Sequence, residues 1–189
     1  DGTQIAYVSF KTGKGDIYLR QADGTGTAQN LVSGPLREFA QHISRNGQFM
    51  TYYVLDPNTS RDLWFMPLTG ERTPAPFLQT DSEEMNPRLS PDARYIAYQS
   101  NESGRWEIYV KEFPSGGGKW QVSTNGGAFP RWNGRGDELF FVEQNTLMAV
   151  SVSTVPTFER RTASPLFSGD QIGVQLFDIT SPWYATYDV

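Results

Sequence analysis

The strongest constraint on the fold of this chain is an internal repeat of about 45 residues. An equivalent turn position is held by Asp1, Asn46, Asp92 and Arg135, at intervals of 45, 46 and 43 residues. The clearest copy is SPDARYIAYQSNESGRWEIYVKEF, residues 90–113. A recurrence of this kind indicates stacked copies of one supersecondary unit, because a single unit cannot bury its apolar face alone.

Each copy has the pattern of antiparallel strands. In the first strand after the turn, apolar residues lie two positions apart, as a half-buried strand requires. A polar turn and a second strand follow, so every copy predicts a β-hairpin. The apolar column on the buried face is formed by Ile5 and Tyr7, Met50 and Tyr52, Ile96 and Tyr98, and Leu139 and Phe141.

A further short strand on either side of the hairpin completes a four-stranded antiparallel meander, which has the size of one blade of a β-propeller. The sequence therefore predicts an all-β fold, a β-propeller with about four blades in this chain. The predicted blades span residues 1–36 (completed by 183–189), 37–82, 83–126 and 127–182.

Two other architectures fit the pattern less well. Helices are disfavoured because the apolar period is two and because Gly, Pro or Asn interrupts every stretch. A β-sandwich would not explain the recurrence of one turn chemistry at a fixed spacing. The composition agrees with strands and tight turns, since the chain has 18 Gly, 12 Pro, 12 Phe, 9 Tyr and 5 Trp.

Charge and composition exclude several functions. With 16 Lys and Arg against 21 Asp and Glu, the net charge of -5 supplies no positive field for nucleic acid. The absence of Cys excludes disulfides, thiolate metal sites and cysteine nucleophiles. No window approaches the ~18 apolar residues that a membrane helix needs, so we expect no membrane insertion in this segment.

The last residues, WYATYDV (183–189), have the pattern of the strand that precedes a turn, whereas the first copy lacks such a strand. We expect them to pair beside residues 4–9, since this would remove an open sheet edge. The pairing could occur within one chain or in a neighbouring chain, and the latter would give a homo-oligomer through terminal strand exchange. A third interpretation is that the chain is a stretch of a longer propeller.

Several sequence segments of this chain follow one another in the order found in one protein family. They are RDLWFMPLTGERTPAPFLQT (61–80), SPDARYIAYQSNESGRWEIYVKEFP (90–114), KWQVSTNGGAFPRWNGRGDELFFV (119–142) and LMAVSV (147–152), followed by PTFE, PLF and YDV. Together they resemble the TolB-like, WD-repeat-like propellers, and most closely the C-terminal propeller of bacterial serine/threonine protein kinases.

This resemblance implies a propeller of six or more blades and a non-catalytic module in the periplasm or outside the cell. Any catalysis would belong to a separate domain, and the chain contains neither H-R-D nor D-F-G. We expect no cofactor. One departure concerns Ala93, which stands where glycine is usual. Because a side chain disfavours positive φ, we expect this turn to differ in type from the others.

Four charged residues are candidates for a channel-mouth binding site. His42, Arg88 and Arg131 occupy equivalent positions, and Asp188 takes that place in the last segment. In a propeller the leading strand is the innermost, so these residues would ring the central channel. Such a ring could bind an anionic group or the acidic terminus of a partner. The simpler interpretation is that the charges solvate the channel and pair with one another.

Neither a catalytic residue nor a metal site is predicted. His42 is the only histidine, and Ser44 beside it lacks the G-x-S-x-G context of a nucleophile. Asp81, Glu83 and Glu84 form the densest oxygen cluster, a weak metal candidate because it lacks the pattern of a calcium-binding loop.

Three carboxylates, Asp16, Asp62 and Glu107, precede the second strand in successive copies. Three carboxylates at equivalent positions resemble a set of metal ligands, but these three belong to different predicted blades. The predicted role is to close the hairpin turn by accepting backbone N–H bonds.

The fourth copy is longer than the others, and inserted propeller loops commonly carry specificity. Its contact candidates are Arg160, Arg161, Phe177 and Trp183.

The primary hypothesis is a non-catalytic binding, sensory or scaffolding propeller that recognises a protein or a small anionic ligand. The second is the substrate-gating propeller of a prolyl-oligopeptidase-like hydrolase. The third is a structural protein that assembles by strand exchange between partial propellers.

Overall fold

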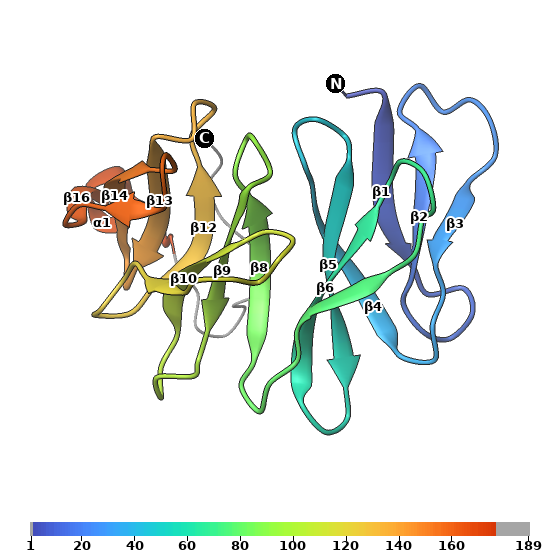
Figure 1. Ribbon diagram of the computed structural model, residues 1–189, viewed down its shortest axis with the longest axis horizontal. Coiled ribbons are helices and arrows are strands. Elements are labelled where there is room, and N and C mark those ends of the chain that lie inside the picture. Colours follow the sequence, from blue (N-terminus) through green and yellow to red (C-terminus); the bar gives the residue numbers. More distant parts are fainter. Residues whose placement is uncertain (1, 177–189) are drawn as a thin grey trace. The chain divides into compact units, whose positions relative to one another are not determined.

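The computed structural model describes residues 2–176, which form sixteen strands and one four-residue helix. The strands build four consecutive antiparallel sheets, so the prediction of an all-β repeat fold is confirmed (Figure 1). The chain divides into two compact units, Asp1–Met85 and Asn86–Val189.

The first unit contains two sheets. One has the order β1 (Gln4–Ser9), β2 (Asp16–Gln21), β3 (Gln29–Val32); the other has the order β4 (Arg37–Ile43), β5 (Phe49–Asp56), β6 (Ser60–Pro67), β7 (Ala75–Leu78). Both are meanders of sequential strands. Their shared core is formed by Ile17, Val32, Met50, Tyr52, Val54 and Met66.

The second unit also contains two sheets. The third sheet consists of β8 (Glu84–Leu89), which begins at the unit boundary, β9 (Tyr95–Ser100), β10 (Glu107–Glu112) and β11 (Trp120–Gln121). The fourth consists of β12 (Ala128–Trp132), β13 (Glu138–Glu143), β14 (Thr146–Ser153), β15 (Glu159–Arg160) and β16 (Ser164–Ser168). The core between them includes Tyr95, Ile108, Val110, Leu139, Phe141, Val150 and Phe158.

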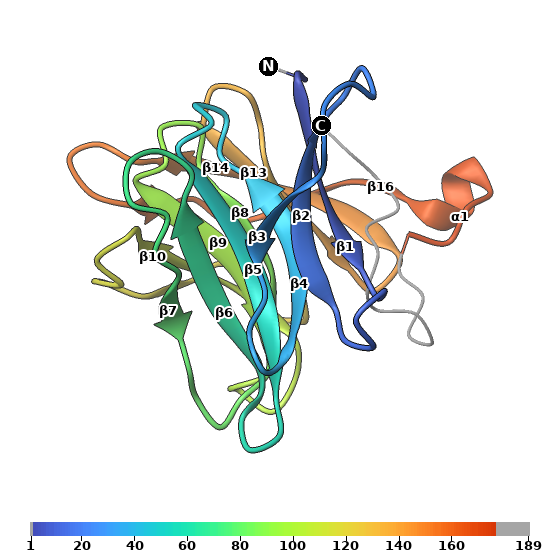
Figure 2. The same cartoon turned by 90° about the vertical axis from the view of Figure 1, so that its right-hand side faces the viewer.

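The long fourth copy accounts for the extra strand of its sheet. Both β15 and β16 pair with β14, at different ends of that strand. The short helix α1 (Gly169–Ile172) follows β16, as Figure 2 shows. Within residues 2–176, no helix is long and apolar enough to cross a membrane.

The predicted apolar column is buried in three copies but not in the first. Met50 and Phe141 are completely buried, whereas Ile5 is 52% and Tyr7 is 37% exposed. Met50 faces the first sheet and Phe141 faces the third, so in the second and fourth sheets this column packs against the preceding sheet of the same unit. In the described part of the chain no sheet precedes β1, and its apolar face is therefore exposed.

A side-chain oxygen holds each turn between the first two strands of sheets two to four. Ser44 and Ser90 each accept, on the hydroxyl, a hydrogen bond from the backbone N–H five residues later, at 2.9 and 3.0 Å. In the fourth sheet, Asn133 Oδ1 accepts from Gly136 N at 2.7 Å. Ser44 thus has a structural partner in its own turn, as expected for a turn-opening residue.

The expectation that Ala93 avoids positive φ was wrong. Its φ is 55°, close to the 68° of Gly47 and the 78° of Gly136 at the equivalent positions. The backbone N–H of Ala93 donates to Ser90 O at 2.8 Å, as Gly47 does to Ser44 O. The turn hydrogen bonds therefore outweigh the steric cost of a left-handed alanine, about 1 kcal/mol.

Candidate functional site

Two of the predicted channel residues lie on edge strands of neighbouring sheets in the second unit. Arg88 is in β8 and Arg131 is in β12 (Figure 1). Each guanidinium Nη1 donates to the carbonyl of the preceding residue, Pro87 at 2.9 Å and Pro130 at 3.0 Å. Proline fits such an edge because it has no N–H to donate. Trp132 Nε1 donates to Arg88 O at 2.9 Å and so connects the two strands.

The other two residues of the predicted ring are not among the described residues of the second unit. His42 lies in β4 of the first unit, where it is half-buried and in register with Thr51. Asp188 lies outside the described residues. The four-residue ring therefore stays a prediction.

Arg160 and Arg161, predicted as loop contacts, line a pocket of about 540 Å³ in the fourth sheet. The pocket lies where the β12–β13 turn meets the ends of β14 and β15. In β15, Arg160 is in register with Val152, and Arg161 N donates to Ser151 O at 2.9 Å. The charged lining residues are Arg135, Asp137, Glu138, Glu159, Arg160 and Arg161. The other predicted contacts, Phe177 and Trp183, lie outside the described residues.

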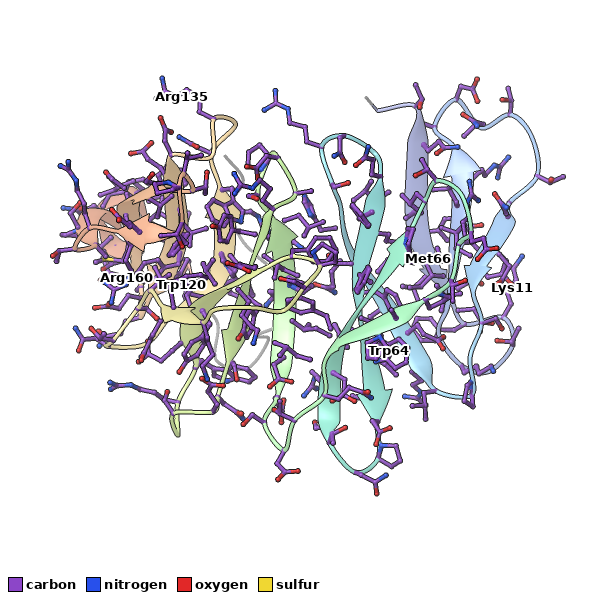
Figure 3. The ribbon with its side chains drawn as sticks, in the orientation of Figure 1. Lys11, Trp64, Met66, Trp120, Arg135 and Arg160 are labelled. Atoms are coloured by element: carbon purple, nitrogen blue, oxygen red, sulfur yellow. The ribbon has the colours of Figure 1, made fainter. Side chains whose placement is uncertain are left out.

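The charges of this pocket differ in how they are paired. Arg135 Nε lies 3.3 Å from Asp137 Oδ2, and Figure 3 shows Arg135 extending from its turn. A hydrogen bond from Asn133, together with the nearby Arg135, lowers the pKa of Asp137. Among residues 2–176, no side chain bonds to the guanidinium group of Arg160 or Arg161. Within the described part of the chain, the pocket thus presents two guanidinium groups without a side-chain partner.

Sequence reasoning did not assign Arg135 to this site. Arg135 was noted only as a turn residue, at a position where Asp or Asn stands in the other copies. This departure from the repeat was the sequence signal that could have identified Arg135 as a site residue. A turn residue is exposed, and arginine at this position replaces a neutral or acidic side chain by a cation.

Phe158 fixes the segment that carries the two arginines. It is 1% exposed, whereas the flanking Thr157 and Glu159 are exposed. Its ring centroid lies 5.3 Å from that of Trp120, 5.7 Å from that of Tyr95 and 6.3 Å from that of Trp132. This aromatic cluster holds the connection between β14 and β15 against the core.

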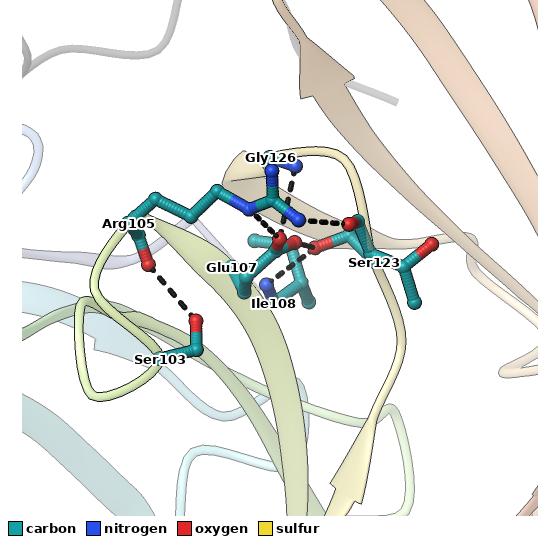
Figure 4. Close-up of polar contacts among 7 residues, drawn as sticks. Ser103, Arg105, Glu107, Ile108, Ser123 and Gly126 are labelled. Carbon is teal, nitrogen blue, oxygen red and sulfur yellow. Dashed lines mark hydrogen bonds and ion pairs between the residues drawn. The ribbon is translucent and has the colours of Figure 1, made fainter.

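The three carboxylates at the start of the second strands are structural. Glu107 is fully buried and accepts from Arg105 Nε at 2.7 Å, Gly126 N at 3.0 Å and Ser123 Oγ (Figure 4). Ser123 Oγ in turn accepts from Ile108 N at 2.8 Å. The carboxylate therefore joins the hairpin turn to the end of the outer strand.

Asp16 and Asp62 are buried in the same way but use side-chain donors. Asp16 accepts from Thr12 Oγ1 and from Ser33 Oγ at 3.0 Å. Asp62 accepts from Thr59 Oγ1 at 2.8 Å and from Gln79 Nε2 at 3.3 Å. The prediction that backbone N–H groups of the hairpin turn donate to these carboxylates was therefore wrong in detail. Most of the donors are side-chain hydroxyl, amide and guanidinium groups.

Of the weak metal candidates Asp81, Glu83 and Glu84, the two glutamates have other partners. Glu83 forms an ion pair with Arg61. Glu84 is buried and accepts a hydrogen bond from Thr80 Oγ1 at 2.6 Å. Within the part of the chain that the structure describes, no three His, Cys, Asp or Glu side chains are arranged to hold a metal ion.

Four consecutive antiparallel sheets, each a copy of one meander with its first strand at the sheet edge, define the β-propeller class of repeat protein. The chain belongs to the TolB beta propeller domain family, whose model matches residues 1–171.

Solved structures show the same fold. TolB from Agrobacterium tumefaciens is 20% identical with a TM-score of 0.73, over 88% of this chain and 62% of that one. TolB from Acinetobacter baumannii is 20% identical with a TM-score of 0.66, over 88% of this chain and 41% of that one. Prolyl oligopeptidase B from Galerina marginata is 12% identical with a TM-score of 0.58, over 87% and 26%. The chain thus spans less than two thirds of each, and at these identities the likeness shows the fold alone.

Proposed function

We propose that this chain is a non-catalytic binding module that recognises an acidic segment of a protein partner through the pocket of its fourth sheet. The observation that supports this function is the pair of exposed guanidinium groups of Arg160 and Arg161, to which no side chain of residues 2–176 bonds. Arg160 ends the edge strand β15 and Arg161 directly follows it, and Phe158 holds this segment in place.

The chemistry of arginine suits this role. Its planar fork of donors matches a carboxylate, and a charge-assisted hydrogen bond is stronger than a neutral one. Glu138 and Glu159 beside the arginines would repel an evenly acidic surface. A short acidic segment that meets Arg160 and Arg161 directly is therefore the better match, and its binding would weaken with salt.

A fluorescent hexaglutamate peptide tests this proposal. Replacing both Arg160 and Arg161 by Ala should weaken its binding at low salt at least tenfold, because two charge-assisted contacts are lost. The control is Arg20→Ala with Arg72→Ala, which removes two exposed arginines of the first unit and changes net charge equally. Fluorescence anisotropy measures the affinities.

A third variant separates this pocket from the edge-strand pair. Arg88→Ala with Arg131→Ala should fold and should leave the peptide affinity within twofold. If that variant, or the charge-matched control, weakens binding as much as the Arg160 and Arg161 variant, the proposed site is wrong.

We also propose a periplasmic or extracellular location and a link to a TolB-like or kinase-associated protein. The family match and the ordered sequence runs support this assignment. The alternative, a substrate-gating propeller of a hydrolase, draws on the fold shared with prolyl oligopeptidase B. Both assignments place catalysis outside this chain.

A second proposal concerns the edge of the first sheet. β5, β9 and β13 each lie between two strands, whereas their equivalent β1 pairs, among the described residues, with β2 alone. We propose that residues 183–189, which lie outside the described residues, supply the missing strand in the same chain or in a second copy.

Deletion of residues 183–189 should therefore expose the β1 edge and cause aggregation, or dissociation if the strand is exchanged between copies. Light scattering after size-exclusion chromatography gives the mass of both proteins. A truncated protein with the mass and unfolding midpoint of the full chain would contradict this strand assignment.

A further inference from the structure

The first unit contains a second pocket, of about 300 Å³, that is independent of the arginine pocket. It lies between the β3–β4 connection and the strands β5 and β6. Its walls are mostly apolar and include Leu31, Val32, Pro35, Leu36 and Val54. Two polar side chains in this lining, Glu38 and Trp64, each have one buried atom without a hydrogen-bond partner among residues 2–176.

Glu38 is a buried carboxylate with one free oxygen. The residue is 3% exposed, and its Oε1 accepts a hydrogen bond from Gly34 N at 2.9 Å. Its Oε2 is buried and has no hydrogen-bond partner among the described residues. Burial raises the pKa of Glu38, and the Asp16 carboxylate raises it further, whereas the hydrogen bond from Gly34 N and the charge of Lys14 oppose this rise. Such an orphan oxygen is costly, because buried polar groups are nearly always hydrogen-bonded.

Trp64 provides the complementary group. It lies on β6, as Figure 3 shows, and its Nε1 is buried without a hydrogen-bond partner among residues 2–176. A buried indole N–H normally donates to an acceptor. Tyr52 also lines the pocket and adds a second aromatic ring, whose centroid lies 6.4 Å from that of the Trp64 ring. The pocket thus offers one unpaired acceptor, one unpaired donor and two aromatic faces.

We propose that this pocket binds a small organic amine with an aromatic or aliphatic body and a hydrogen-bond acceptor. The ammonium group donates to Glu38 Oε2 and neutralises the carboxylate. The body fills the apolar lining and contacts the Tyr52 and Trp64 rings, which also attract a cation. The acceptor of the ligand accepts a hydrogen bond from the indole N–H of Trp64. This ligand class supplies what each of the two orphan groups lacks.

Three phenols with different head groups test the proposal. Tyramine carries the amine and an acceptor oxygen, 4-ethylphenol lacks the amine, and 4-hydroxyphenylacetate carries a carboxylate instead. We expect tyramine to bind at least tenfold more tightly than 4-ethylphenol, and 4-hydroxyphenylacetate not to bind. Calorimetry measures affinity. The indole N–H signal of Trp64, assigned by its loss in Trp64→Phe, should shift with tyramine.

Glu38→Gln is the decisive variant, and it should retain the fold because it removes a buried charge while keeping the side-chain shape. We expect this variant to bind tyramine at least tenfold more weakly than the wild type does, and to bind 4-ethylphenol with an affinity within threefold of the wild-type value. The matched control is Glu84→Gln, the equivalent glutamate one repeat later, which is also buried. It should leave tyramine binding unchanged.

Three results would overturn the proposal. They are equal affinity of wild type and Glu38→Gln for tyramine, equal binding of the carboxylate analogue, and an unshifted Trp64 signal at millimolar tyramine. The last would mean that water satisfies the two polar groups. Failure of the hexaglutamate experiment would not affect this site, since the two pockets share no residue.

Discussion

Replacing Phe158 by alanine is expected to lower the free energy of unfolding by about 3–5 kcal/mol, because it removes a buried aromatic ring and leaves a cavity. The ring is 1% exposed and contacts three other aromatic rings in the core between the third and fourth sheets. Urea unfolding followed by tryptophan fluorescence measures the loss.

The matched control for Phe158→Ala is Leu166→Ala in β16 of the same sheet. Leu166 is 52% exposed, so its truncation should change stability by about 0.5 kcal/mol or less. The Phe158 variant should also weaken hexaglutamate binding, since it releases the segment that carries Arg160 and Arg161. A loss no greater than that of the Leu166 variant would contradict the anchoring role.

Replacing Glu107 by alanine should lower the free energy of unfolding by about 2–4 kcal/mol, because one buried and one half-buried donor lose their acceptor. These donors are Ser123 Oγ and the backbone N–H of Gly126. The side chain of Arg105 is 61% exposed and can be solvated after the change, so it adds little to the cost.

Glu102 provides the control for Glu107→Ala. It also pairs with a basic residue, Lys119 Nζ at 2.7 Å, but its side chain is 26% exposed and that of Lys119 is 48% exposed. Glu102→Ala should therefore cost about 1 kcal/mol or less. Equal losses in the two variants, measured by urea unfolding, would show that burial of Glu107 does not set its contribution.

The architecture could be predicted because its signal is repeated. Alternating apolar residues and the Ser or Asn that opens each turn recur in several copies, so an exchange in one copy does not obscure the pattern. The turn of Ala93 shows the limit of residue propensities. Its hydrogen bonds were not visible in the sequence, and they hold an alanine at a φ of 55° that propensity disfavours.

Burial in the first copy could not be predicted from the pattern. Ile5 and Tyr7 match their equivalents in alternation, yet both are exposed. Alternation identifies which face of a strand is apolar, whereas burial depends on whether another sheet covers that face.

The candidate sites were predicted only in part. Arg160 and Arg161 were identified because they interrupt the repeat, and the structure adds Arg135 to the same pocket. The orphan atoms of Glu38 and Trp64 gave no sequence signal, because residue type and position in the repeat do not reveal the hydrogen-bond partners of a buried side chain. Only coordinates show which buried oxygen or N–H lacks a partner.

The buried carboxylates have a consequence for how such proteins change over evolution. Asp16, Asp62 and Glu107 each take their hydrogen-bond donors from their own copy of the repeat. A gene duplication that copies one repeat therefore copies each of these carboxylates together with its donors. Gain or loss of whole blades would then require compensation at the faces between sheets, where many hydrophobic side chains are interchangeable, and at inter-sheet hydrogen bonds such as that from Trp132 Nε1 to Arg88 O.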